Sequence, residues 1–257
     1  MTKYDNINLR EKYEDPTSGV EFFTRPKGIN IDITHRCPLE CPRCPRQTVF
    51  KNNNEIVYGH DISLDDIKKV TKYFKRFDFC GQLSDPVHHP KFIEILKHLY
   101  DNNVWETSIH NASSAKSKSW YIKAFQANPT ARWIFGIDGL PEESCLYRVN
   151  QDGEKLFNIM LESKKHLLNP PWWQFIIFSY NEHHLEQAKK MAKDNGVYFI
   201  EVQSSRWNDN PNIDKIDPLR PSKKYLIEEP YVMAEHKTLS ARGRELDYFF
   251  GRKKEEK

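Results

Sequence analysis

Ile29-Asn30-Ile31-Asp32-Ile33-Thr34-His35-Arg36-Cys37-Pro38-Leu39-Glu40-Cys41-Pro42-Arg43-Cys44 is the segment around which the chain is arranged. Isoleucine alternates with a polar residue over the first six positions, which is the period-two pattern of a half-buried β-strand. The loop that follows holds three of the five cysteines of the chain. Three thiolates so close in sequence cannot all pair with one another, but together they can surround one metal centre. The segment therefore predicts a strand that leads into a metal-binding loop.

The composition is that of an ordinary globular protein. Of its 257 residues, 38% are hydrophobic and 29% are charged, so the chain can bury one sizeable core. No apolar run approaches the roughly 20 residues that a membrane span needs. The first residues also lack the apolar block of a secretory signal. We therefore expect no membrane as a partner.

The net charge and the cysteine content limit which binding partners and which cellular compartment we expect. The formal net charge of +3 is small for a dedicated nucleic-acid binder, which needs a denser basic surface. The five cysteines are odd in number and unevenly spaced, which argues against a disulfide framework. We expect a reducing, cytoplasmic location and do not favour nucleic acid as the main partner.

Strand and helix patterns alternate along the rest of the chain. Strands are predicted at residues 29–34, 77–83, 104–110, 132–137, 173–178 and 197–202. The helices between them begin near Ser63 and Pro90 or span residues 114–127, 154–168 and 182–195. This alternation predicts parallel strands joined by right-handed crossovers. Since six units are two short of the eight in a closed barrel, we predict an α/β fold, a partial (β/α)6 TIM-like barrel.

The same pattern divides the chain into three parts. Residues 1–28 form a polar lead-in, residues 29–206 the partial barrel, and residues 207–257 a short C-terminal extension rich in turn residues and proline. We expect the extension to cover the open side of the barrel and, with it, the active site.

The cysteine loop is predicted to lie where parallel α/β proteins bind their ligands, at the carboxyl ends of the strands. The spacing Cys-x3-Cys-x2-Cys supplies Cys37, Cys41 and Cys44 as candidate metal ligands. Three thiolates are one fewer than a closed tetrahedral site or a fully ligated cubane cluster requires. An open coordination position is typical of a catalytic metal centre.

A strand, this motif and six βα units in sequence resemble the radical S-adenosylmethionine superfamily over residues 29 to about 206. The resemblance implies that the three cysteines hold three irons of a [4Fe-4S] cluster and that S-adenosyl-L-methionine chelates the fourth. It implies reductive cleavage of that cofactor to a 5′-deoxyadenosyl radical, which abstracts a hydrogen atom from the substrate, and a small electron donor such as a flavodoxin or ferredoxin. Because no cysteine follows Cys145, we expect a single cluster without an auxiliary-cluster domain.

Four further segments are similar to cofactor-binding segments of this family. Residues 79–86 resemble the glycine-rich end of strand two, which receives the amino group of the cofactor, and residues 108–112 resemble the end of strand three. Residues 136–139 resemble its Ser-x-Asp-Gly motif, with glycine in place of the serine, and residues 147–153 its arginine segment. The resemblance thus implies cofactor contacts from Gly81, Gln82, Asp85, Asn111, Gly136, Asp138 and Arg148.

Arg43 departs from the family pattern. The residue before the third cysteine is often aromatic in the family and lies along the adenine, whereas here it is an arginine. A guanidinium plane can also stack on a base, so we include Arg43 among the cofactor-binding residues as a hypothesis.

Several alternatives stay open. The three cysteines and His35 would make a Cys3His zinc site, in which case the chain would be a non-catalytic metal-binding or nucleic-acid-associated module on the same barrel. Cys145 is the candidate catalytic residue, as a hydrogen-atom donor, with a passive thiol as the alternative; Cys80 is expected to be a small apolar interior residue.

The side chains of adjacent histidines, such as His183 and His184, should point in different directions and not chelate one ion. The substrate is not identified, with a peptide or a nucleotide slightly favoured.

Overall fold

The computed structural model describes residues 11–14, 21–24, 27–47, 59–81, 83–203 and 216–226. In the lead-in, β1 (Glu11–Glu14) and β2 (Glu21–Thr24) pair antiparallel, with Glu11 opposite Thr24. This hairpin was not predicted, although Phe22, Phe23 and Thr24 are residue types that favour strands.

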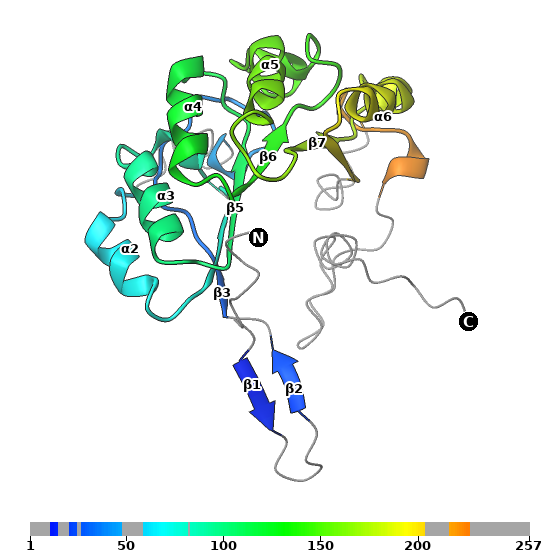
Figure 1. Ribbon diagram of the computed structural model, residues 1–257. Coiled ribbons are helices and arrows are strands. Elements are labelled where there is room, and N and C mark those ends of the chain that lie inside the picture. Colours follow the sequence, from blue (N-terminus) through cyan, green and yellow to red (C-terminus); the bar gives the residue numbers. More distant parts are fainter. Residues whose placement is uncertain are drawn as a thin grey trace.

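Six parallel strands form the main sheet, and they pair in the order in which they occur in the chain (Figure 1). They are β3 (Gly28–Asn30), β4 (Arg76–Phe79), β5 (Glu106–Asn111), β6 (Arg132–Gly136), β7 (Trp172–Ile176) and β8 (Tyr198–Val202). The helices between them are α2 (Leu64–Val70), α3 (Phe92–Asp101), α4 (Lys118–Ala127), α5 (Gly153–Ser163) and α6 (Leu185–Asp194). This confirms the predicted α/β fold and partial (β/α)6 barrel.

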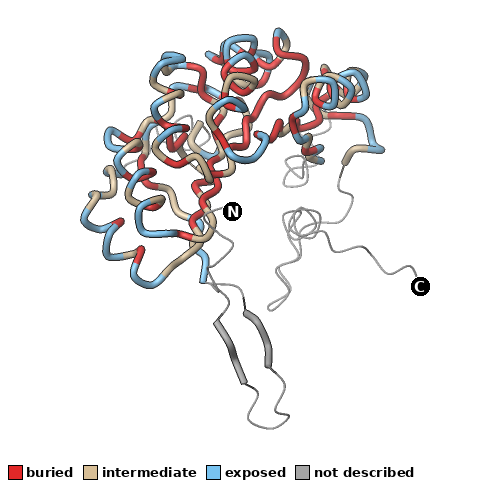
Figure 2. Tube along the Cα trace, viewed as in Figure 1, coloured by how far each residue is buried: buried red, intermediate tan, exposed pale blue. Residues whose placement is uncertain are grey.

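The helices cover one face of the sheet, and the main core lies between the two layers. Along β6, Trp133 and Phe135 are fully buried in that core, as are Trp173 and Phe175 along β7. Figure 2 shows buried segments running through the strands, with exposed segments on the outer sides of the helices. Aromatic residues at alternate positions therefore anchor the helices to the sheet.

The opposite face of the sheet, here called the concave face, carries the residues between those core positions. In β6, β7 and β8 these include Ile134, Trp172 and Ile200, which form a separate small apolar cluster. In β4 to β6 they include Arg76, Glu106 and Arg132, where Glu106 pairs with both arginines. One half of the concave face is thus apolar and the other half charged.

The first two strands of this sheet end earlier than predicted, and each for an identifiable reason. β3 ends at Asn30, and beyond it Asp32 accepts hydrogen bonds from the Leu83 backbone N–H (3.2 Å) and the Ser84 hydroxyl (3.1 Å). β4 ends at Phe79 because the chain turns at Gly81, whose φ is +61°. Long-range side-chain bonds and a left-handed glycine therefore replace the expected ladder.

Two helices start later than predicted. Ser117 caps α4 by accepting a hydrogen bond from the Trp120 N–H, so α4 begins at Lys118 instead of at residue 114. A short 3₁₀ helix, η3 (Glu182–His184), precedes α6. The predicted cap of α2 is confirmed, since the Ser63 hydroxyl accepts from the Asp66 N–H at 3.1 Å.

Within the described ranges no helix combines the length and the apolar character that crossing a membrane requires.

Candidate functional site

The cysteine loop lies at the carboxyl ends of the strands, as its position after β3 predicts. Cys37, Cys41 and Cys44 pack against one apolar cluster together with Ile176 of β7 and Val202 of β8. Two hydrogen bonds also connect the loop to the segment before α5. The Glu40 N–H donates to the Val149 carbonyl (3.2 Å), and the Asn150 side chain donates to the Pro38 carbonyl (3.1 Å). Residues far apart in sequence thus place the three thiols at the edge of the sheet formed by the carboxyl ends of the strands.

Burial favours the protonated form of the Cys37 and Cys41 thiols. It raises the pKa of the Cys37 thiol to about 12, with the nearby Asp85 carboxylate adding to the effect and the Leu39 N–H opposing it. Burial also raises the pKa of Cys41, against the opposing charge of Arg148. Since a metal ligand must be a thiolate, a bound metal has to displace these protons.

The spacing of the three sulfurs favours a multi-iron group over one zinc ion. Ligands of a single tetrahedral zinc sit about 2.3 Å from it, so they lie within roughly 4 Å of one another. Two groups of three candidate ligand atoms lie within 4.8 Å of each other in the part of the chain that the structure describes, and the motif cysteines belong to neither. In a cubane cluster each sulfur binds a different iron, which needs a wider spacing. The three sulfurs are thus not gathered as tightly as one zinc ion requires, while their number, three thiolates, is the set that leaves one iron of a [4Fe-4S] cluster open.

Arg148 brings a positive charge to this loop. Its Nε donates to Asp138 Oδ2 at 2.7 Å, and its Nη1 lies 4.0 Å from the Cys41 sulfur. Burial by itself lowers the pKa of Arg148, but the charges of Asp138 and Cys41 outweigh it and raise the pKa above its usual value. The guanidinium therefore stays charged beside the cysteines.

Asp138 is fully buried and holds Arg148 in place. Its Oδ1 accepts the Ile176 N–H at 2.8 Å, while its own N–H donates to the Ser144 hydroxyl at 2.8 Å. The predicted cofactor residues Asp138 and Arg148 are thus brought together as an ion pair.

Asp85 connects the ends of β4 and β5. One carboxylate oxygen accepts the N–H groups of Ala112 and Ser113, each at 2.8 Å, and the other accepts the Val87 N–H at 3.2 Å. Burial raises the pKa of Asp85 to about 6, although these backbone groups oppose the shift. Its carboxylate is occupied by the protein's own backbone, so the structure gives it a role in shaping the site.

Gly81 and Asn111 are likewise engaged within the fold. A Cβ at Gly81 would lie 2.1 Å from the Ser84 carbonyl oxygen, so the turn itself requires glycine. The Asn111 side chain is buried and donates to the Tyr121 hydroxyl at 3.0 Å. Gln82 lies outside the described residues.

Gly136 lies beside a residue that the sequence did not single out, Gln151. The buried Gln151 side-chain amide donates to the carbonyls of Ala112 (2.5 Å) and Gly136 (2.9 Å), and so joins the ends of β5 and β6. A Cβ at Gly136 would lie 3.2 Å from Arg148, so glycine leaves room for that guanidinium. No local pattern marks Gln151, because its partners lie 39 and 15 residues away in the chain.

Arg43 is held by the C-terminal part of the chain. Its Nε donates to Asp217 Oδ2 at 2.7 Å, and the two side chains form an ion pair. Leu219, two residues further on, packs against the apolar cluster of the cysteines. The described residues 216–226 of the extension thus contact the cysteine loop. The prediction that residues 207–257 cover the active site stays a prediction, because the remainder lies outside the described residues.

The remaining candidates are Cys145 and the two adjacent histidines. Cys145 is exposed, and its thiol donates to the Glu142 carbonyl at 3.6 Å. The expectation that His183 and His184 diverge was wrong, because their ring centroids are 3.9 Å apart. Both belong, with Glu143, to one of the two groups of closely spaced candidate ligands.

Comparisons with known proteins agree with this architecture. No protein-family model matches the chain. The chain is 28% identical to a PqqA peptide cyclase of Bradyrhizobium diazoefficiens and 26% identical to one of Rhodopseudomonas palustris. Each of these matches extends over 104 residues, which is 38% of this chain. In each case the matched part of this chain corresponds to 26% of the relative's length, so about three quarters of the relative has no counterpart in the match.

Solved structures share the fold. Two structures of anSMEcpe with bound AdoMet, one of the histidine-tagged protein and one of the native protein, each superpose with a TM-score of 0.50. The first is 17% identical and covers 70% of this chain and 52% of its own; the second is 16% identical and covers 69% and 53%. Like these proteins, the chain has a parallel sheet with alternating helices, and it carries the Cys-x3-Cys-x2-Cys loop after the first of six parallel strands, so the comparisons show a shared fold and a partial sequence similarity to PqqA peptide cyclases.

Proposed function

We propose that the chain is a radical S-adenosylmethionine enzyme whose Cys37, Cys41 and Cys44 hold one [4Fe-4S] cluster. The observation that carries the proposal is the common packing of these three cysteines against the carboxyl ends of β7 and β8. Bound to these cysteines, the cluster would supply the electron for reductive cleavage of S-adenosyl-L-methionine, and that cofactor would supply the 5′-deoxyadenosyl radical for abstraction of a hydrogen atom from the substrate.

The chain's own residues prepare the site for this chemistry. Tyr147 and Phe178 stack with ring centroids 4.2 Å apart beneath the loop, so they exclude water from the buried side of the cysteines. Arg148, fixed by Asp138, supplies a positive charge that favours thiolates and can attract the carboxylate of the cofactor. Arg43 is proposed to lie along the adenine.

We propose a peptide as the substrate. The curated relatives are named for a peptide on which they act, which supports this choice over a nucleotide. The concave face also offers both a charged half, at Glu106 and Arg132, and an apolar half, at Trp172 and Ile200, which suits a chain of mixed side chains. The electron donor is proposed to be a flavodoxin or ferredoxin in a reducing cytoplasm.

Anaerobic reconstitution tests the proposal. The full chain should bind about four irons per molecule, bind S-adenosyl-L-methionine in calorimetry and release 5′-deoxyadenosine after reduction with dithionite. Serine in place of Cys37, Cys41 or Cys44 should abolish cleavage and lower the iron content, while Cys145→Ala should keep the iron. A colourless, iron-free protein would contradict the proposal and leave the non-catalytic module as the better description. Cleavage by the triple serine variant would contradict the assignment of the three cysteines as ligands of the cluster.

A second measurement addresses the substrate. Deuterated peptides and nucleotides are incubated anaerobically with the reduced enzyme, and deuterium is sought in the 5′-deoxyadenosine released. Transfer from a peptide supports the proposal, whereas transfer from nucleotides alone would contradict the choice of peptide.

A further inference from the structure

Three side chains with metal-binding chemistry meet on the concave face, apart from the motif cysteines. Asp78 lies in β4, Cys80 directly follows that strand, and His110 lies in β5. Their neighbours Phe79 and Ile109 are fully buried in the core on the other face. Since side chains alternate along a strand, Asp78, Cys80 and His110 share the concave side of the sheet.

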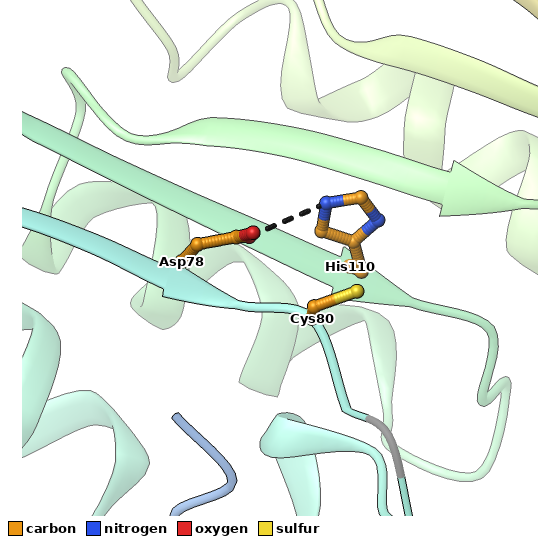
Figure 3. A group of neighbouring side chains, drawn as sticks. All are labelled: Asp78, Cys80 and His110. Atoms are coloured by element: carbon orange, nitrogen blue, oxygen red, sulfur yellow. Dashed lines mark ion pairs between the residues drawn. The ribbon is translucent and has the colours of Figure 1, made fainter. Parts of the chain in front are cut away.

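The side chains are close enough to hold one ion. One ligand atom from each, a carboxylate oxygen, a sulfur and a ring nitrogen, lies within 4.8 Å of the others. The His110 Nε2 is 3.4 Å from Asp78 Oδ1 (Figure 3). Figure 3 also shows the Cys80 sulfur beside the imidazole, with His110 coming from the neighbouring strand. Parallel pairing of β4 with β5 creates this arrangement, with Phe79 opposite Ile109.

We propose that Asp78, Cys80 and His110 form a second metal site, for zinc or a chemically similar divalent ion. A thiolate with an imidazole selects a borderline or soft metal over magnesium or calcium, which prefer oxygen ligands. Zinc bonds of about 2.0 to 2.3 Å place tetrahedral ligands roughly 3 to 4 Å apart, so small rotamer changes complete the site.

The site would be an open one. It supplies three protein ligands, and zinc takes four, so the fourth position is left for water or a donor atom of a bound molecule. All three residues are half-buried, with 22% of the His110 side chain and 36% of the Asp78 side chain exposed, so an ion can reach them. The three residues come from β4 and β5 or directly follow β4, and these strands also carry Arg76 and Glu106 of the charged half of the concave face.

The other closely spaced group, Glu143, His183 and His184, is a weaker candidate. His183 is exposed, and the two histidines are adjacent in the chain. Asp78, Cys80 and His110 instead come from two paired strands of the sheet, whose backbone positions are fixed by the ladder. A rigid scaffold of this kind holds ligands in place before the ion binds.

Cobalt titration of the full chain tests the site. Cys37, Cys41 and Cys44 are replaced by alanine so that they cannot bind the probe, and Co²⁺ is added anaerobically. We expect one Co²⁺ per chain, with a thiolate-to-cobalt absorption band in the near ultraviolet that Zn²⁺ removes. Cys80→Ser should abolish the band, and His110→Ala or Asp78→Asn should each weaken binding at least about tenfold. Cys145→Ser, which removes an exposed thiol elsewhere, should change neither.

The outcome decides the proposal. No stoichiometric binding to a folded chain, or a band that persists in Cys80→Ser, would overturn it and leave Asp78 and His110 as an ion pair beside a passive thiol. If the triple alanine variant does not fold by circular dichroism, zinc is measured instead in cluster-reconstituted wild-type protein and its Cys80→Ser variant after equilibration with Zn²⁺. One extra zinc in the wild type supports the site, and equal zinc in both overturns it.

Discussion

The guanidinium of Arg148 lies between two groups, with Nε 2.7 Å from Asp138 Oδ2 and Nη1 4.0 Å from the sulfur of Cys41. Asp138 is fully buried at the carboxyl end of β6. The sheet is thereby connected to the cysteine loop through a buried ion pair, which should matter for stability and, under the function proposed above, for cofactor binding.

Asp138→Asn should therefore destabilise the protein strongly. The asparagine can still accept the Ile176 N–H, but Arg148 is left as a buried charge without its partner, which costs about 3–5 kcal/mol in free energy of unfolding. Urea unfolding of the apoprotein measures this loss of stability. Lys97→Ala, which breaks the exposed pair with Asp101, is the control and should cost less than about 1 kcal/mol. Similar losses in both variants would contradict the importance of the buried pair.

Gly81→Ala should cost more than Gly196→Ala, although both glycines have a φ of +61°. At Gly81 the new Cβ would meet the Ser84 carbonyl oxygen at 2.1 Å, whereas at Gly196 it would meet the flexible end of Lys164 at 3.2 Å. We expect about 1 kcal/mol at Gly196 from backbone strain and more than about 2 kcal/mol at Gly81. The comparison uses urea unfolding, and equal losses would show that the turn after β4 can relax.

Arg43→Ala should weaken binding of S-adenosyl-L-methionine to the reconstituted protein. Loss of a stacking partner for a base costs roughly 1 kcal/mol or more, so we expect an increase in Kd of about fivefold or greater by calorimetry. Arg36→Ala is the control, because Arg36 is exposed and paired with Asp61. An unchanged Kd in Arg43→Ala would show that the arginine serves only to bind Asp217.

His88 should make stability depend on pH in mildly acidic solution. Burial lowers its pKa to about 4, with the charges of Lys116 and Arg36 adding to the effect. Between about pH 6.5 and 4 the unfolded chain binds a proton that the folded chain does not, so stability is full above this window and falls as the pH falls through it.

His88→Gln removes this titration and can keep the hydrogen bond to the Ser113 hydroxyl. The loss of stability on acidification should then be smaller by roughly 1 kcal/mol, an amount reduced by the solvent that reaches the ring. Urea unfolding of both apoproteins at pH 7 and pH 4.5 gives the difference. An equal loss of stability between pH 7 and pH 4.5 in both proteins would assign the acid sensitivity to other groups.

The approximate positions of the strands were predictable from sequence because most of them carry large apolar residues. Trp133 with Phe135, and Trp173 with Phe175, mark strands by composition alone. The ends of the elements were less predictable. The strand predicted at residues 77–83 ends at Phe79, and the helix predicted from residue 114 begins at Lys118. The strand ends early because the chain turns at Gly81, and the helix begins late because Ser117, and not an earlier residue, supplies its cap.

The same distinction applies to the site. The spacing of Cys37, Cys41 and Cys44 is a local signal, so the sequence alone located the loop. The backbone partners of Asp85 could not be predicted, because Ala112 and Ser113 follow a different strand. Gln151 and the group around Cys80 were missed for the same reason, since neither is recognisable before the strands are paired.

The sheet of the described residues does not form a ring, because β3 and β8 are its two edges and each pairs with a single neighbour. A closed cylinder admits a molecule only through its mouth, end first. An open sheet imposes no such order, so a polymer can lie across it with both of its ends outside. A residue in the middle of a long polypeptide is then as accessible as one at its terminus.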